Sequence, residues 1–151
     1  LERLTGGGRP GGPVELRVNI PLPELKELYS EAGLFWHVCG LTHDDPSEIE
    51  HFGMTTVEAM QNRVVPLVYD GGGLREIVDQ GLNGFRVRTT GQLLEATIRL
   101  LKDPALRSRL AEAAADKARV YSRARFEERV RDFFGGLLRE YLPVAGRNFG
   151  T

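Results

Sequence analysis

The 151-residue sequence has few cysteines and no long apolar run, and each shortage excludes a class of protein. The single cysteine, Cys39, cannot form an internal disulfide and suggests a reducing compartment. Because it stands between Val38 and Gly40 beside an apolar run, we expect it to be buried. No stretch approaches the roughly 18 apolar residues of a membrane span, and the N-terminus lacks the pattern of a signal peptide. We therefore expect a cytoplasmic protein that touches a membrane at most peripherally.

An excess of charge of either sign is also missing. Lys and Arg number 20 against 21 Asp and Glu, which leaves a formal charge of -1. A protein that binds the phosphate backbone of a nucleic acid usually has an excess of Lys and Arg, so nucleic acid is not the expected partner. Residues 1–98 are net acidic and residues 99–151 net basic, which is typical of solvated helix faces at the C-terminal end.

Nucleophile motifs are absent as well. No serine lies in a G-x-S-x-G elbow, and Cys39 has no sequence context of a nucleophile. Acidic and imidazole side chains do gather in the loop over 43–51, so a metal-binding hydrolase is an alternative. No H-E-x-x-H spacing supports it, and we expect no metal site. The loop residues in question are His43, Asp44, Asp45, Glu48, Glu50 and His51.

Glycine and proline divide the chain into segments. Residues 1–13 hold so many of both that we expect a flexible loop, followed by one domain over 14–142 and a tail over 143–151. Alternating apolar residues predict a strand over 14–20, and continuous apolar runs predict strands over 34–38, 64–69 and 85–87. The strand over 34–38 should be covered on both faces. Helical spacing predicts helices over 23–32, 54–60, 74–79, 91–102, 104–120 and 123–142.

Strands and helices alternate over most of the sequence. This order predicts an α/β fold: a Rossmann-like open parallel sheet with helices on both faces, followed by C-terminal helices. The last helix has an apolar stripe that should cover something, formed by Phe126, Val130, Phe133, Phe134, Leu137, Leu138 and Tyr141.

The segment from Glu50 to Met60 follows a predicted strand and opens a helix. The first turn of a helix leaves backbone N–H groups unpaired at the positive end of the dipole, which suits a phosphate. Gly53 lets a ligand approach closely, and Thr55 and Thr56 can add a hydroxyl. Glu58 lies one turn further on the same face as Thr55, where a carboxylate suits a ribose diol. The residues alone leave open a capped helix with two surface glutamates.

A second glycine-rich turn, Gly71-Gly72-Gly73, also leaves a predicted strand and opens a helical turn. It lacks the third glycine of the dinucleotide-binding pattern G-x-G-x-x-G. Together the two turns should lie at the carboxyl edge of a parallel sheet, where open α/β sheets bind ligands.

Several motifs in order resemble one family over about residues 14 to 140. They are Glu50 and Glu58 with seven residues between them, the intervening His51-Phe52-Gly53-Met54, Glu58-Ala59-Met60, Val65-Pro66, Gly72-Gly73 with Glu76-Ile77-Val78, and Gly81-x-Asn83-Gly84-Phe85. The chain is similar to the C-terminal, sugar-nucleotide-binding domain of retaining glycosyltransferases of family four. These enzymes have the two-domain GT-B fold, of which this chain would be part of the C-terminal half.

The resemblance implies a role for each matching residue. Glu58 binds the ribose hydroxyls, and Glu50 lies beside the donor sugar as the catalytic residue. Ile20, at the end of the preceding strand, touches the base through its backbone. The backbone amides that meet the sugar hydroxyls and the diphosphate are those of Phe52, Gly53, Met54 and Thr55. The donor would be a UDP-, GDP- or ADP-sugar, used as a substrate with no cofactor and no required metal.

The sequence also departs from that family. Asn62 stands where a glycine would give a left-handed turn after the helix, and we expect Asn62 to supply that turn. The basic pair that neutralises the diphosphate, the catalytic histidine and the acceptor-binding N-terminal domain have no counterpart in these residues. We therefore expect an inactive donor-binding fragment whose open sheet edge invites self-association. A non-enzymatic module that binds a nucleotide or a partner protein is the other alternative.

Overall fold

The computed structural model describes residues 14–41 and 49–141. The chain divides into two compact units, Leu1–Glu31 and Ala32–Thr151. The expected loop over 1–13 and the tail over 143–151 lie outside the described residues.

The N-terminal unit contains one described helix, α1 (Leu22–Glu31), and the helix predicted over 23–32 is thereby confirmed. The strand predicted over 14–20 is wrong, because these residues have no regular structure. Val14, Leu16 and Val18 are more than half exposed. A strand is stable through hydrogen bonds to a neighbouring strand, and the described part of this unit contains no second strand. Alternation of apolar residues was therefore not enough to predict a strand.

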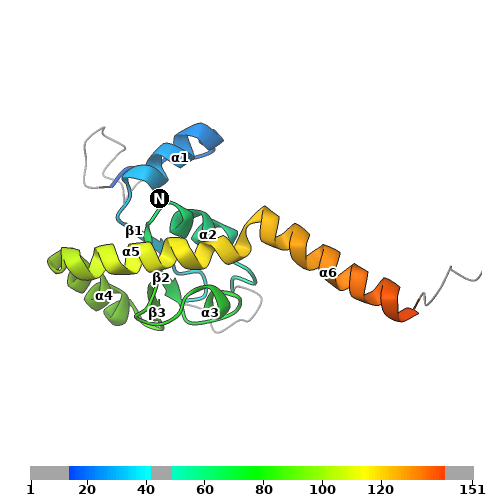
Figure 1. Ribbon diagram of the computed structural model, residues 1–151. Helices are drawn as coiled ribbons and strands as arrows, with labels where there is room; N and C mark the ends of the chain where they lie inside the picture. Colours follow the sequence, from blue (N-terminus) through cyan, green and yellow to red (C-terminus); the bar gives the residue numbers. More distant parts are fainter. Residues whose placement is uncertain (1–13, 42–48, 142–151) are drawn as a thin grey trace, which may run out of the picture. The chain divides into compact units, whose positions relative to one another are not determined.

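The larger unit is built on a parallel sheet of three strands, β1 (Leu34–His37), β2 (Val65–Tyr69) and β3 (Phe85–Val87), in the order β1-β2-β3. Helices connect and follow the strands (Figure 1). They are α2 (Met54–Gln61), α3 (Leu74–Ile77), α4 (Thr90–Lys102), α5 (Pro104–Ala118), the 3-10 turn η2 (Arg119–Tyr121) and α6 (Arg123–Tyr141). The predicted α/β fold with a parallel sheet is confirmed.

Alternate residues of β2 enter two separate core clusters, so helices cover both faces of the sheet. Val65 and Leu67 pack with residues of α4 and the first half of α5, including Leu110. Val68 packs with α2, α3 and the second half of α5, where Ala114 and Ala118 are fully buried. Helix α5 therefore contributes to both clusters.

Two local expectations for the first buried strand are wrong. Trp36 in β1 is 55% exposed, so this outer strand is not covered on both faces. Cys39 is exposed, because the chain has already left the sheet after His37 and turns at Gly40. Apolar neighbours in the sequence do not bury a residue that lies past the end of its strand.

The turn after α2 also differs from the expectation. Asn62 keeps a negative φ of -93° and Arg63 takes the left-handed conformation with φ 60°. The Asn62 side chain donates to the Glu58 carbonyl (2.9 Å), and Val64 N donates to Ala59 O (3.1 Å), which closes the helix. The left-handed residue is thus one position later than expected.

The apolar stripe of α6 is largely exposed. Phe126, Phe133, Phe134 and Leu138 each show more than half of their surface. Within the described residues nothing covers this stripe, and the expectation that it covers an apolar surface stays a prediction. Among those same residues, no helix combines the length and apolar character that crossing a membrane requires.

Candidate functional site

The carboxyl ends of the parallel strands bring three loop starts to one edge of the sheet. His37 ends β1, Asp70 follows β2 and Arg88 follows β3. Open parallel sheets bind their ligands at this edge. Glu50 and the start of α2 belong to the same region, because the His37 side chain contacts both of them.

The Glu50 carboxylate binds the two backbone amides directly before α2. Its Oε1 accepts hydrogen bonds from the backbone N–H groups of Phe52 and Gly53, each at 3.1 Å. The bond from Phe52, helped by the one from Gly53 and by His37 and His51, lowers the pKa of Glu50 against the opposing effect of partial burial. Glu50 is therefore ionised at neutral pH. Two of the amides expected to meet the ligand are engaged by this carboxylate.

His37 connects β1 with both Glu50 and α2. Its Nδ1 lies 3.1 Å from the Thr56 hydroxyl, and its Nε2 lies 3.6 Å from Oε2 of Glu50. The two ring nitrogens of His37 thus contact the Thr56 hydroxyl on one side and the Glu50 carboxylate on the other. Thr56 is fully buried, so its hydroxyl orients the histidine and does not point to a ligand as expected.

The glycine turn after β2 packs directly on the backbone of the Glu50 loop. Gly73 N donates to Glu50 O at 3.2 Å. A Cβ on Gly72 would lie 2.1 Å from Glu50 O, and one on Gly73 would lie 2.2 Å from His51 O. Gly72 also has φ +51°, a conformation that favours glycine. The two strand-to-helix turns thus meet at one edge, and only glycine allows their close approach.

Glu58 lines a shallow hollow of about 310 Å³ on the outer side of α2. Its side chain is half-buried, and the edge of the Phe52 ring packs against Tyr121 nearby, with 6.1 Å between ring centroids. The other lining residues are Phe52, Met54, Val57, Gln61 and Tyr121. The structure thus brings three of the expected ligand-binding residues, Phe52, Met54 and Glu58, to one hollow.

The remaining site predictions are not decided by the geometry. Thr55 lies exposed in the first turn of α2. Ile20 belongs to the N-terminal unit, so its contact with a base stays a prediction. His43, Asp44, Asp45 and Glu48 lie outside the described residues. Within the described ranges, no group of three or more His, Cys, Asp or Glu side chains is arranged to hold a metal.

One charged cluster, around Asp70, was not predicted from the sequence. Asp70 accepts from Nε of Arg75 (2.9 Å) and Nε of Arg88 (2.8 Å), and Nε of Arg86 lies 3.8 Å away. Partial burial raises the pKa of Asp70, but the hydrogen bonds from Arg88 and Arg75 outweigh it and lower the pKa overall. The available signal was a charged residue directly after each of two predicted strands.

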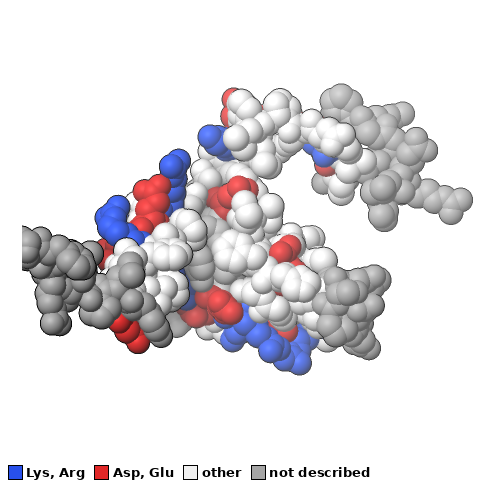
Figure 2. Space-filling view, turned by 90° about the vertical axis from the view of Figure 1, so that its right-hand side faces the viewer, with Lys and Arg blue, Asp and Glu red and all other residues white. Residues whose placement is uncertain are grey.

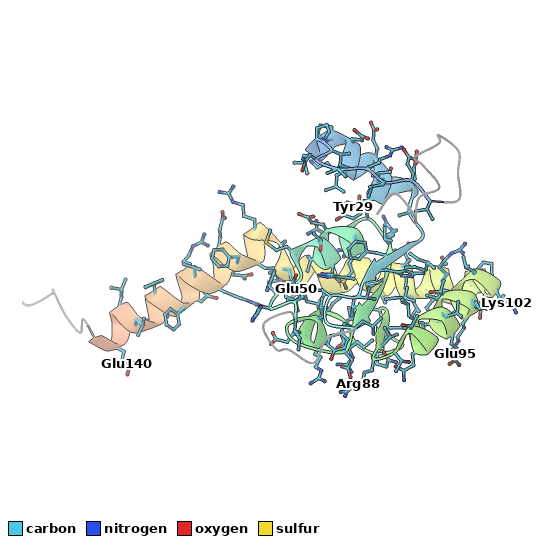
Figure 3. The ribbon with its side chains drawn as sticks, turned by 180° about the vertical axis from the view of Figure 1, so that it is seen from behind. Tyr29, Glu50, Arg88, Glu95, Lys102 and Glu140 are labelled. Carbon is cyan, nitrogen blue, oxygen red and sulfur yellow. The ribbon has the colours of Figure 1, made fainter. Side chains whose placement is uncertain are left out.

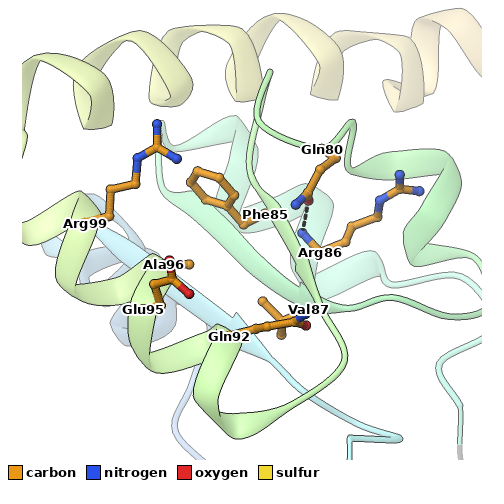
Figure 4. Close-up of a pocket in the computed structure, with 8 residues that line it drawn as sticks. All are labelled: Gln80, Phe85, Arg86, Val87, Gln92, Glu95, Ala96 and Arg99. Carbon is orange, nitrogen blue, oxygen red and sulfur yellow. Dashed lines mark hydrogen bonds between the residues drawn. The ribbon is translucent and has the colours of Figure 1, made fainter.

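A second hollow, of about 210 Å³, lies between β3 and α4 (Figure 4). Arg99 stacks over the Phe85 ring at 5.7 Å, and Gln80 accepts from Arg86 N at 2.6 Å. Glu95, Gln92, Val87 and Ala96 complete its lining. None of the residues predicted to form the site lines this hollow.

Comparison with known proteins decides the family. The family model described as glycosyl transferases group 1 matches residues 14–117, more than half of the chain. This chain belongs to that family. The match includes Glu50, Glu58 and the glycine turn.

Curated relatives of this group 1 chain include two named transferases. An alpha-D-kanosaminyltransferase of Streptomyces kanamyceticus is 36% identical over 72 residues, which is 46% of this chain and 19% of the relative. A poly(glycerol-phosphate) alpha-glucosyltransferase of Bacillus subtilis is 33% identical over 85 residues, or 54% of this chain and 13% of the relative. The group 1 chain therefore spans less than a fifth of the length of either relative.

Solved structures similar to the group 1 chain show the same fold. Anabaena HepE in complex with UDP has a TM-score of 0.64 at 22% identity, over 82% of this chain and 31% of that one. Sucrose-phosphate synthase of Thermosynechococcus elongatus scores 0.59 at 26% identity, over 82% and 29%. The C-terminal domain of the group 1 protein LpcC of Francisella tularensis scores 0.58 at 22% identity, over 82% and 59%. The chain thus has the α/β fold of GT-B glycosyltransferase structures.

Proposed function

We propose that this chain is the donor-binding part of a glycosyltransferase of family four, the C-terminal half of a GT-B fold. The complete enzyme would move a hexose from a nucleotide sugar to an acceptor with retention of the anomeric configuration. The observation that carries the proposal is the ionised Glu50 carboxylate fixed at the start of α2, with Glu58 on the same helix beside a hollow. The complex of the similar Anabaena protein with UDP supports a nucleotide donor.

The donor would lie across the start of α2. Glu58 would hold the ribose hydroxyls, because a half-buried carboxylate accepts two hydrogen bonds from a diol better than water-exposed groups do. The diphosphate would lie at the positive end of the α2 dipole, near the Met54 and Thr55 amides.

Glu50 would orient the donor sugar. Its Oε1 is occupied by the Phe52 and Gly53 amides, so Oε2, which faces His37, is the oxygen that would accept from a sugar hydroxyl. Fixing a charged group before the reaction lowers the cost of reorganisation in the transition state. The effect of Glu50 would therefore be on turnover more than on donor affinity.

The chain by itself should bind the donor without transferring sugar. It covers only 13% to 31% of the two curated relatives and of the first two similar structures. Transfer needs the donor and the acceptor held in one geometry by closed domains. We propose that the catalytic step needs no metal ion.

A nucleotide titration monitored through amide NMR signals tests donor binding. UDP, GDP and ADP would each be added up to millimolar concentration to the 151-residue chain. We expect one of them to shift the amides of residues 53–58 in a saturable way. Glu58→Gln should weaken this binding roughly tenfold or more, the usual effect of losing hydrogen bonds to a charged group. Glu112→Gln, which changes an exposed glutamate on α5, is the matched control and should have no effect.

Turnover tests the catalytic role. In the complete enzyme, Glu50→Gln should lower the rate of nucleoside diphosphate release far more than it lowers the affinity for the donor. The proposal is wrong if no nucleotide perturbs residues 53–58, or if turnover is indifferent to the loss of the Glu50 charge.

A further inference from the structure

Three arginines from three segments converge on a single carboxylate. Arg75 lies on α3, Arg86 on β3 and Arg88 directly after β3, and all contact Asp70 at the end of β2. Figure 3 labels Arg88 at the lower edge of the larger unit, and Figure 2 shows Lys and Arg side chains gathered at that height with acidic groups among them. Because the partners come from separate parts of the sequence, the fold itself positions this cluster.

The cluster has more positive than negative charge. Asp70 is ionised at neutral pH, since its pKa is lowered, and it faces three guanidinium groups. Its side chain is 22% exposed, whereas those of Arg75 and Arg88 are 48% and 63% exposed. The anion lies inside and the cations face the solvent, so the cluster presents a net positive surface.

Hydrogen-bond donors remain available on that surface. Arg75 uses Nε and Nη2 on the carboxylate and the carbonyl of Asp70, and Arg88 uses Nε on the same carboxylate. A guanidinium has five N–H donors in a fixed plane. Held by Asp70 along one edge, Arg75 and Arg88 can each offer their other N–H groups to a ligand in a nearly fixed orientation. Guanidinium groups arranged in this way suit the oxygens of a phosphate.

The cluster adjoins the proposed donor site. Asp70 directly precedes the glycine turn, and Gly73 of that turn donates to the Glu50 carbonyl at 3.2 Å. A group bound at Arg75 and Arg88 would therefore approach the sheet edge beside the Glu50 loop. It would not compete with a nucleotide at α2, whose binding involves different residues.

We infer that Arg75 and Arg88, braced by Asp70, bind a phosphate ester carried by the acceptor substrate. This inference rests on the proposed function: it assigns the chemical class of acceptor that the donor sugar would reach, and it adds a contact from this domain to an acceptor that the resemblance places on the N-terminal domain. The phosphate could belong to a soluble acceptor or to a lipid headgroup.

Side-chain NMR of arginine tests the inference on the 151-residue chain, with glycerol 3-phosphate as the probe. We expect the Nε–H signals of Arg75 and Arg88 to shift with saturation. Arg88→Ala should raise the apparent Kd at least about tenfold, since a charge-assisted pair is lost. Arg125→Ala is the matched control: its side chain is 62% exposed and pairs with one glutamate, and its loss should leave the Kd unchanged.

A second arm separates the two sources of phosphate. Vesicles of phosphatidylcholine with and without phosphatidylglycerol would be sedimented with the chain. Retention by the anionic vesicles that Arg88→Ala abolishes assigns the site to a headgroup, and saturable binding of glycerol 3-phosphate alone assigns it to a soluble acceptor. Either result supports the site.

The inference is overturned if neither probe binds, or if Arg88→Ala and Arg125→Ala have equal effects, which would indicate general screening of charge. The separate UDP titration of residues 53–58 distinguishes this failure from failure of the proposed function. Binding of UDP without any phosphate-ester response would remove only the acceptor site.

Discussion

Replacing Gly73 by alanine should displace the Glu50 loop. The backbone of Gly73 has φ -66° and ψ -18°, which alanine adopts readily, so conformational preference is not the obstacle. The new Cβ would lie 2.2 Å from His51 O and 2.8 Å from the carbonyl carbon of His51. These are backbone atoms, which cannot rotate away as a flexible side chain can.

The expected magnitude follows from this clash. The His51 carbonyl would have to move by about 1 Å to reach an ordinary contact of 3.4 Å or more. Overpacking of this kind typically destabilises a protein by about 1–3 kcal/mol. Losing the 3.2 Å bond from Gly73 N to Glu50 O adds roughly 0.5–1.5 kcal/mol. We therefore expect Gly73→Ala to lower the free energy of unfolding by about 1.5–4.5 kcal/mol.

Urea unfolding at constant pH measures this change, and amide NMR of residues 50–53 reports the loop. Gly136→Ala is the control, because a Cβ at this helical glycine would meet nothing within 4 Å. It should leave the signals of residues 50–53 unchanged. An unaltered midpoint and unaltered loop signals in Gly73→Ala would refute the reasoning, because they would mean that the two turns do not touch.

Three further predictions test other parts of the larger unit. Folding lowers the pKa of Glu50, so the stability that the carboxylate contributes should be present above its unfolded pKa and be lost as the pH falls through its folded pKa. The difference in unfolding free energy between wild type and Glu50→Gln, measured by urea unfolding at several pH values, should therefore shrink on acidification. A difference that stays constant with pH would contradict the lowered pKa. Asp103→Ala should destabilise the unit by about 0.5–2 kcal/mol, since the carboxylate caps α5 by accepting from Leu106 N at 2.8 Å, and calorimetry would show this as a lower Tm. Gly136→Ala should stabilise the chain by roughly 0.5–1 kcal/mol, because alanine favours the interior of a helix; an unchanged urea midpoint would show that α6 does not persist in solution.

Local sequence signals predicted the elements that a contiguous pattern of residues defines. The helix that starts after Gly53 and the buried strand β2 were predicted almost to the residue, because the apolar spacing and the glycines that define them are contiguous. The strand over 14–20 failed, since alternation says nothing about whether a partner strand is available. Cys39 failed for a related reason: burial depends on where the strand ends in space.

The sequence predicted where the candidate site lies but not its hydrogen bonds. Glu50 and Glu58 were identified from their spacing, yet the sequence could not indicate that the Glu50 carboxylate would bind the Phe52 and Gly53 amides. That outcome depends on how the loop folds back on the helix. The arginines around Asp70 were missed because their pairing joins residues up to 18 positions apart, on different strands and helices.

Helix α5 determines how far α2 lies from the sheet. At the residues where it packs with Val57 and Met60 of α2, it carries Ala114 and Ala118, both fully buried. A methyl group is the smallest side chain that still fills the space between two helices, so these alanines act as a spacer of fixed thickness. Residues more than fifty positions away in the sequence thereby determine where Glu58 and the amide end of α2 stand. A bulkier residue at either alanine would tilt the surface proposed to face the nucleotide without touching a ligand.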